Sequence, residues 1–184
     1  MRAFIAMDLD NPAVLTEIQR FQEQIKQTEG DVKIVAPQNV HFTLMFLGEI
    51  SDEEVSLLKE KLSAIKHSAF EAELKGSGVF PNPSRINVVW VGVDSSGETN
   101  LRNIADGIVK SISGSKFEPD KPFEPHLTVA RIKSRRAREK ILEVVTNNSS
   151  TDFGRQQFNE FRLKKSELTP AGPIYTDLYC FKLG

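Results

Sequence analysis

The sequence predicts a duplicated, bilobal α+β protein whose halves face each other across a shared cleft. The four-residue frames HFTL, residues 41–44, and HLTV, residues 126–129, lie 126 − 41 = 85 residues apart in a chain of 184 and use two of its three histidines. Each frame is followed by a helix, a strand, a proline-containing turn and another strand. A shared order is harder to obtain by accident than matching letters, so we expect one domain, residues 1–184, with two pseudo-twofold lobes that each contribute one H-x-T-x motif.

Strands and helices alternate in the first half. Asn11 and Pro12 are typical of an N-cap and a first helical position, and Gly30 of a helix end. Ser51 and Glu54 form the capping box of a second helix. The predicted strands are residues 2–9, 32–35, 41–47, 70–80 and 86–93. Apolar residues recur at helical spacing at Val14, Leu15, Ile18, Phe21 and Ile25, at Val55, Leu58, Leu62 and Ile65, and at Leu101, Ile104, Ile108 and Ile112.

The second half repeats this order with a strand at residues 125–132, a helix at 135–145 and a strand pair at 158–168 and 173–183. LKGSGVFPNP from Leu74 aligns with LKKSELTPAG from Leu163 at a spacing of 89. We therefore expect equivalent strands to meet at a common cleft, which is a preferred location for ligand sites.

Composition narrows the class of protein. The chain has 24 basic and 25 acidic residues. This near balance argues against a protein that binds its partner mainly through a large net positive charge. The single cysteine, Cys180, cannot form an internal disulfide, and the N-terminal segment meets Asp8 before it resembles a signal peptide. The longest apolar runs are shorter than the roughly 20 residues of a membrane-spanning helix. We expect a soluble, cytoplasmic protein that does not contact membranes.

The two frames suit acid–base chemistry. Side chains alternate in a strand, so His41 and Thr43 share one face while Phe42 and Leu44 point into the core, and His126 and Thr128 share a face in the same way. Histidine titrates near neutrality and can remove or deliver a proton. Displacement at phosphorus needs both steps, and threonine hydroxyls can stabilise the phosphate oxygens.

Other readings of the histidines carry less weight. A lone strand histidine is more often structural than catalytic, but two matched frames favour one shared site. Zinc sites use three or four protein ligands, and the remaining candidates are poor: Cys180 lies in a buried-looking strand and His67 near a helix end. We therefore expect no metal and no cofactor.

These residues resemble the two-histidine phosphoesterases, whose signature is two H-x-T-hydrophobic motifs in a duplicated bilobal fold. HFTLMFLGEI, GVFPNP, PHLTVARI and LKKSELTPAGPIY are similar to the RNA 2′,3′-cyclic phosphodiesterases, also called 2′-5′ RNA ligases, and the similarity spans nearly the whole chain. The resemblance implies antiparallel sheets lining a central cleft with helices outside. It also implies hydrolysis of an RNA-terminal 2′,3′-cyclic phosphate to a 2′-phosphomonoester, and reversible, ATP-independent 2′-5′ ligation.

The resemblance also implies roles for individual residues. His41 would be the proton donor to the leaving 3′ oxygen and His126 the proton acceptor that activates water, while Thr43 and Thr128 would hold phosphate oxygens. Arg131 matches the arginine after the second motif, but strict alternation would point it away from His126 unless a bulge or the strand end redirects it. Met45 departs from the family, in which lysine is frequent at this position.

Two further features bear on RNA. RIKSRRAREK, residues 131–140, crowds Arg135, Arg136 and Arg138 at the predicted start of a helix, where the dipole disfavours cations. Most charge runs are solvated surface, but RNA phosphates would explain this placement. Candidates for base stacking are Phe46, Phe80, Trp90, Phe123 and Tyr175, of which Phe80 and Phe123 fit the cleft rim best and the others, Trp90 above all, fit the core.

We expect an enzyme acting on RNA that ends in a 2′,3′-cyclic phosphate, as a monomer with no obligate protein partner. Two alternatives stay open at this point. One is a phosphodiesterase for small cyclic nucleotide or nucleotide-sugar phosphates, and the other is a non-catalytic module that binds RNA ends.

Overall fold

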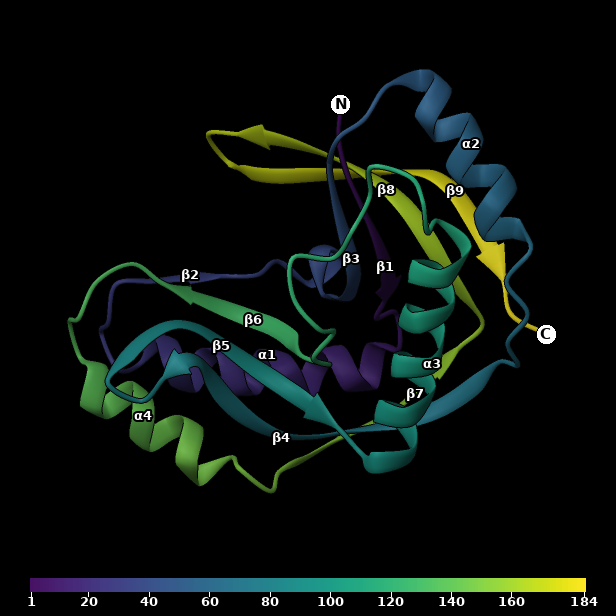
Figure 1. The fold of residues 1–184 in the computed structure, drawn as a ribbon. Coiled ribbons are helices and arrows are strands. Elements are labelled where there is room, and N and C mark those ends of the chain that lie inside the picture. The colour runs from purple at the N-terminus through teal and green to yellow at the C-terminus, as the bar shows by residue number, and fades with distance from the viewer.

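Nine strands, all paired antiparallel, and four α-helices form the fold of the computed structural model, which describes residues 1–184 and confirms the predicted α+β class (Figure 1). The strands are β1 (Arg2–Asp8), β2 (Val32–Ile34), β3 (His41–Glu49), β4 (Phe70–Asn82), β5 (Arg85–Val93), β6 (Leu127–Ile132), β7 (Asp152–Phe158), β8 (Glu160–Thr169) and β9 (Gly172–Lys182). The helices are α1 (Pro12–Lys26), α2 (Asp52–Ser63), α3 (Ser95–Ser111) and α4 (Arg138–Asn147), with a 3-10 turn, η1 (Pro37–Asn39).

The strands follow the order β7-β4-β5-β6-β3-β1-β8-β9, and β2 pairs with β6. The two motif strands, β3 and β6, meet in the middle through one residue pair, Phe42 opposite Leu127. The expected two sheets are thus joined at the motifs, with β7, β4, β5, β6 and β2 on one side and β3, β1, β8 and β9 on the other.

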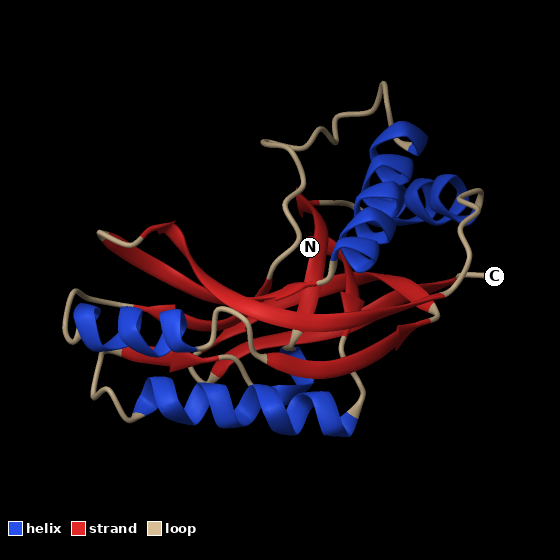
Figure 2. Ribbon diagram, turned by 90° about the horizontal axis from the view of Figure 1, so that it is seen from below, coloured by secondary structure: helices blue, strands red, loops and turns tan.

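Helices lie outside the strands, as Figure 2 shows. Helix α1 packs on β7, β2 and β6 and touches α4, whereas α2 contacts β9 and α3 contacts β3 and β4. The caps read from the sequence are present: Asn11 Oδ1 accepts from the Ala13 amide, and Ser51 and Glu54 form a capping box. One hydrophobic cluster continues through both sides of the sheet.

The two halves of the chain exchange their hairpins. The β4–β5 hairpin of the first half lies beside β6, the motif strand of the second half. The β8–β9 hairpin of the second half lies on the β3 side, separated from β3 by β1. Each side of the sheet therefore holds one motif strand, but is built from both halves of the chain.

The secondary structure differs from expectation in the second half of the chain. Strand β7 (Asp152–Phe158) was not predicted, because Gly154 at φ 103° and the buried Gln156 interrupt its apolar alternation. Helix α4 begins at Arg138 and not at residue 135, because Ala137 takes a left-handed conformation (φ 57°). Arg135 and Arg136 thus precede the helix. None of the helices combines the length and apolarity that crossing a membrane requires.

Candidate active site

The pair that joins the two sides of the sheet also brings the two motifs together. Phe42 and Leu127 are opposite each other and fully buried, so their side chains share the core face. Continuing this register places His41 across from Thr128 and Thr43 across from His126, all on the opposite face. The four residues are half-buried, in agreement with the predicted alternation. The structure thus gathers both imidazoles and both hydroxyls at one junction.

Both histidines are held in the same way. Nδ1 of His41 donates to the carbonyl oxygen of Asn39 at 2.7 Å, and Nδ1 of His126 donates to that of Glu124 at 2.8 Å. Each acceptor lies two residues before its histidine. Because a carbonyl oxygen only accepts, the proton of the neutral ring is fixed on Nδ1, which leaves Nε2 for chemistry. In His41, Nε2 lies 2.9 Å from the Thr43 hydroxyl.

His41 lies among aromatic rings. Phe4 and Tyr175 lie with ring centroids 5.1 and 5.4 Å from the His41 ring. Burial lowers the pKa of His41, opposed by the Asn39 carbonyl and the Asp8 carboxylate and assisted by the cations of Lys164 and Arg131. The contact with Tyr175 was not predicted, because Tyr175 arrives on the β8–β9 hairpin from the far end of the chain.

His126 has a different neighbourhood. The edge of its ring meets Phe80 at 4.9 Å, and Trp90 lies 5.5 Å behind Phe80. Burial lowers the pKa of His126, opposed by the Glu124 carbonyl. Phe80 thus lies beside the site, as expected of a rim residue. Trp90 is only half-buried and lies opposite Thr128, so the prediction of a core position was wrong for this residue.

A β-bulge lies at the same position of each motif strand. In β3 the register shifts at Leu44, since Ala6 pairs with Thr43 and Ile5 with Met45. In β6 it shifts at Val129, whose carbonyl accepts from Gln22 Nε2 and the Val35 amide, both at 3.0 Å. Both bulges lie three residues after the histidine.

The bulges turn the residue five positions after each histidine to the site face. These residues are Phe46, 71% exposed, and Arg131, also exposed. The bulge that Arg131 requires is therefore present. Met45 is turned into the core and is 5% exposed, so its side chain does not face the site.

A cluster of charged residues beside His41 was not predicted from the sequence. Lys164 Nζ, in a side chain 7% exposed, lies 2.6 Å from Asp8 Oδ2 and 2.9 Å from Asp177 Oδ1. Arg162 contacts the same two carboxylates at 3.2 and 2.7 Å. Asp8 is the cross-strand partner of His41, so the cluster lies on the site face. The available signal was FRLK in β8, where cations alternate with the buried Phe161 and Leu163.

The remaining candidates lie elsewhere or have other partners. His67 follows α2 and packs on Phe70, with Nδ1 bonded to the Ser68 carbonyl. Cys180 is on β9, where burial raises the pKa of its thiol. Phe123 packs against the core, and its carbonyl accepts from Arg102. No group of three or more His, Cys, Asp or Glu side chains is placed to hold a metal ion.

Two H-x-T motifs meeting at the centre of an antiparallel α+β fold define a two-histidine phosphoesterase. Residues 3–177 match the family described as AKAP7 2'5' RNA ligase-like domain, and the chain belongs to that family. It is 38% identical over 182 residues to the RNA 2′,3′-cyclic phosphodiesterase of Archaeoglobus fulgidus, covering 99% of this chain and all of that protein. Identity to the RNA 2′,3′-cyclic phosphodiesterase of Methanothermobacter thermautotrophicus is 37% over 187 residues, covering all of this chain and 99% of that protein.

Solved structures share the fold. TT0787 of Thermus thermophilus superposes with a TM-score of 0.78 at 30% identity, covering 99% of this chain and 97% of that chain. LigT of E. coli in its apo form gives a TM-score of 0.79 at 27% identity, covering 99% of this chain and 96% of that chain. The similarity therefore extends over the whole domain and not only the motifs.

Proposed function

We propose that the protein is an RNA 2′,3′-cyclic phosphodiesterase, which hydrolyses a terminal cyclic phosphate to a 2′-phosphomonoester by metal-free acid–base catalysis. The observation that carries this proposal is the matched pair of imidazoles. Each has Nδ1 held by a carbonyl two residues earlier and Nε2 left for proton transfer. The names and full-length similarity of the archaeal relatives support RNA as the substrate.

In the proposed reaction His126 is the base. Its neutral Nε2 removes a proton from water as the water oxygen attacks phosphorus. His41 enters as the imidazolium, and its Nε2 proton passes to the 3′ oxygen as the P–O3′ bond breaks. One proton is taken up and one released, so water plus the cyclic diester yields a 2′-phosphate and a 3′-hydroxyl. The two histidines exchange protonation states and return to their starting forms through solvent.

Thr43, Thr128 and Arg131 bind the non-bridging oxygens in this proposal. The hydroxyl of Thr43 already bonds His41 Nε2, so it can turn to a phosphate oxygen when substrate occupies that position. Arg131 supplies the positive charge: burial lowers the pKa of both histidines and the Arg131 cation assists it, whereas burial raises the pKa of Tyr175 and the Arg131 cation opposes it. These donors stabilise charge that builds on phosphorus as it becomes five-coordinate.

The same geometry serves ligation, in which the 5′-hydroxyl of a second strand replaces water as the nucleophile. The P–O5′ bond forms as the P–O3′ bond breaks, so a 2′-5′ linkage and a 3′-hydroxyl result without ATP. Attack of that 3′-hydroxyl on the new linkage, with the 5′-hydroxyl leaving, is the reverse reaction. We propose one bilobal domain, residues 1–184, in which each lobe contributes one motif. Because one chain supplies both motifs, the enzyme acts as a monomer without an obligate protein partner. A cytoplasmic location fits its lone cysteine.

The test is an oligonucleotide ending in a 2′,3′-cyclic phosphate, incubated with the protein in a chelator, with 2′- and 3′-phosphate products resolved. We expect 2′-phosphate, and a rate loss of about 10² to 10⁴ in His41→Ala and in His126→Ala. His67→Ala is the matched control, since this histidine lies outside the site, and it should keep the wild-type rate. A folded His41→Ala or His126→Ala variant with undiminished rate would contradict the proposal, as would dependence of the wild-type rate on added metal.

A further inference from the structure

A row of cations leads away from the site along β6, and beyond Arg131 it is not used by the proposed chemistry. We call it the basic track, and its members are Lys33, Arg131, Lys133, Arg135 and Arg136. All five side chains are exposed. Residues 131–140 hold six basic side chains against one acid, although the whole chain carries a formal net charge of −1. The positive charge is therefore concentrated at this end of the sheet.

Like charges in the track are brought together without compensation. Lys33 and Arg131 are cross-strand partners in the β2–β6 ladder, so their side chains share one face. Like charges directly opposite each other in a sheet are destabilising. None of the five residues forms an ion pair, whereas Arg138, the next arginine, contacts Glu139 and donates to the Pro83 carbonyl. An arrangement that costs stability and is not neutralised within the chain fits an anionic ligand.

The track begins at the site and leaves it on one side. Along β6 the cross-strand positions run from His126 with Thr43, through Thr128 with His41, to Arg131 with Lys33. His41 thus lies between His126 and the track. Lys133 lies five residues beyond Thr128, roughly 16 Å along an extended chain. Arg135 and Arg136 follow in the loop to α4, at the left of Figure 1.

The β8–β9 hairpin limits the other side of this path. Asn39 Nδ2 donates to the Pro173 carbonyl at 3.2 Å, and a Cβ on Gly172 would lie 4.0 Å from Lys33 Nζ. The hairpin end thus reaches β2 beside the start of the track. A strand bound at His41 meets Lys33 and Arg131 first, and the exposed cations beyond them next.

We infer that the basic track binds the phosphates of the RNA body, 5′ of the nucleotide that carries the cyclic phosphate. The inference rests on the proposed function and deepens it, since it assigns the substrate as an RNA strand and not a small cyclic nucleotide. The direction agrees with the proposed roles. The ribose 3′ oxygen receives its proton from His41, so the ribose and the chain attached to it lie on the His41 side, where the track begins.

The experiment compares two substrates in the triple variant Lys133→Ala/Arg135→Ala/Arg136→Ala. One substrate is a 2′,3′-cyclic mononucleotide, and the other is a single-stranded oligonucleotide with the same terminal nucleotide. For a single strand, each neutralised phosphate contributes about −0.7 to the slope of log K against log [salt]. Removing three contacts should reduce the slope by about 2. On the oligonucleotide, the ratio of the wild-type kcat/KM to that of the triple variant should therefore fall about 20-fold when the salt concentration rises fourfold. The mononucleotide rate should not change.

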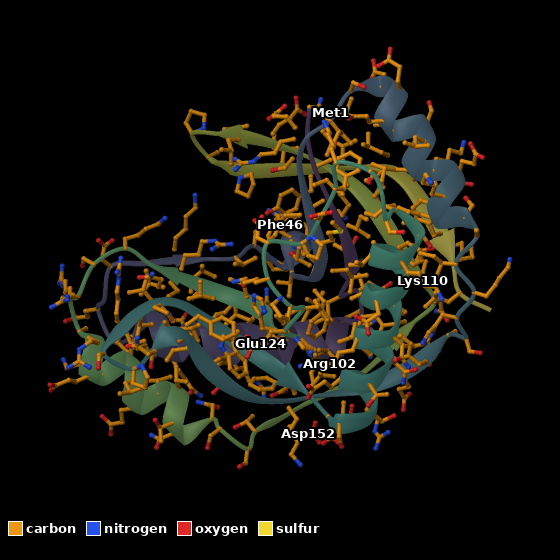
Figure 3. The ribbon with its side chains drawn as sticks, viewed as in Figure 1. Met1, Phe46, Arg102, Lys110, Glu124 and Asp152 are labelled. Atoms are coloured by element: carbon orange, nitrogen blue, oxygen red, sulfur yellow. The ribbon has the colours of Figure 1, made fainter.

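The matched control removes three cations elsewhere, in Lys66→Ala/Lys75→Ala/Lys110→Ala. All three are exposed and unpaired, and Lys110 lies on α3 at the right of Figure 3, away from the track. This variant has the same net charge as the test variant. It should keep the wild-type salt slope on both substrates, because it leaves the cations of the basic track in place. If only long-range attraction by the net charge mattered, the two variants would lose equally.

Binding of the 2′-phosphate oligonucleotide product, measured by fluorescence anisotropy, separates this inference from the proposed function. If the wild type hydrolyses neither substrate but the test variant alone loses affinity and salt slope, the track is supported and the proposed function fails. Equal losses on mononucleotide and oligonucleotide would overturn the inference, because the residues would then act at the phosphate itself. Unchanged behaviour on both substrates, or equal losses in the control variant, would also overturn it.

Discussion

Gly78→Ala should damage the site from a distance, because the space beside Gly78 is filled by an indole ring. Gly78 and Trp90 are cross-strand partners in β4 and β5. A Cβ on Gly78 would lie 2.2, 2.6 and 2.7 Å from Cζ2, Cη2 and Cε2 of Trp90. Carbon atoms in contact are about 3.5 to 4.0 Å apart, so the ring would have to move by more than about 1 Å. A rigid bicyclic ring cannot do this by bending.

The displaced ring would press on Phe80, whose centroid is 5.5 Å from that of Trp90 and 4.9 Å from that of His126. Overpacking of this kind costs about 1 to 3 kcal/mol of stability. A catalytic group misplaced by about 1 Å can lose about 10² in rate. We therefore expect Gly78→Ala to fold, to lower the free energy of unfolding by that amount, and to lower kcat about 10- to 100-fold.

Urea unfolding and kcat on a 2′,3′-cyclic nucleotide measure the two effects, with Gly107→Ala as the control. Gly107 lies within helix α3, and a Cβ added there would lie 3.7 Å from its nearest neighbour, Ile65 Cγ2, which is an ordinary contact distance. Alanine there should stabilise by about 0.5 to 1 kcal/mol through helix propensity and leave kcat unchanged. If Gly78→Ala matched this control in both stability and kcat, the contacts from Gly78 through Trp90 and Phe80 would not influence the position of His126, and the reasoning would be refuted.

Charge changes beside His41 should move the alkaline limb of the kcat/KM profile in opposite directions, because the proposed role of His41 as the acid requires its imidazole to be protonated. Asp8→Asn removes a carboxylate that raises the pKa of His41, so the limb moves to lower pH, whereas Lys164→Met removes a cation that lowers this pKa, so the limb moves to higher pH. The measurement is kcat/KM against pH for both variants, and alkaline limbs that move in the same direction would refute the role of these charges. Phe46→Ala should weaken a 5′-hydroxyl strand about tenfold in ligation through lost stacking, while hydrolysis, in which water takes that place, keeps its rate.

The placement of the motif side chains on one face was predictable because its signal is local and repeated. His41 with Thr43, and His126 with Thr128, are each fixed on one face by the period of a strand. The helices were predictable because their caps lie within a few residues of their apolar stripes, as at Asn11 and at Ser51. These features depend on neighbours in sequence, and the structure keeps them.

What the sequence did not reveal depends on distant partners. The single pair of Phe42 and Leu127 joins the two sides of the sheet, and no local pattern marks these residues as opposite each other. Tyr175 reaches His41 only because the C-terminal hairpin crosses to the β3 side. Strand β7 exists because it pairs with β4 and packs under α1, which compensates for a sequence that is weak on its own.

The two motifs share the same H-x-T-x pattern, yet the proposed reaction needs one histidine as acid and the other as base. The bulges suggest how the two motifs come to differ. Leu44 and Val129 occupy the same position after their histidines, so the duplication fixes where the side chains of Phe46 and Arg131 point. The two side chains then differ in chemistry. Figure 3 labels Phe46 on β3, where an exposed ring suits any base, whereas Arg131 opens a row of cations that suits phosphates. In the proposed function an RNA strand therefore has one favourable orientation. We infer that this asymmetry, rather than a difference in how the two imidazoles are held, determines which histidine meets the leaving oxygen and acts as the acid.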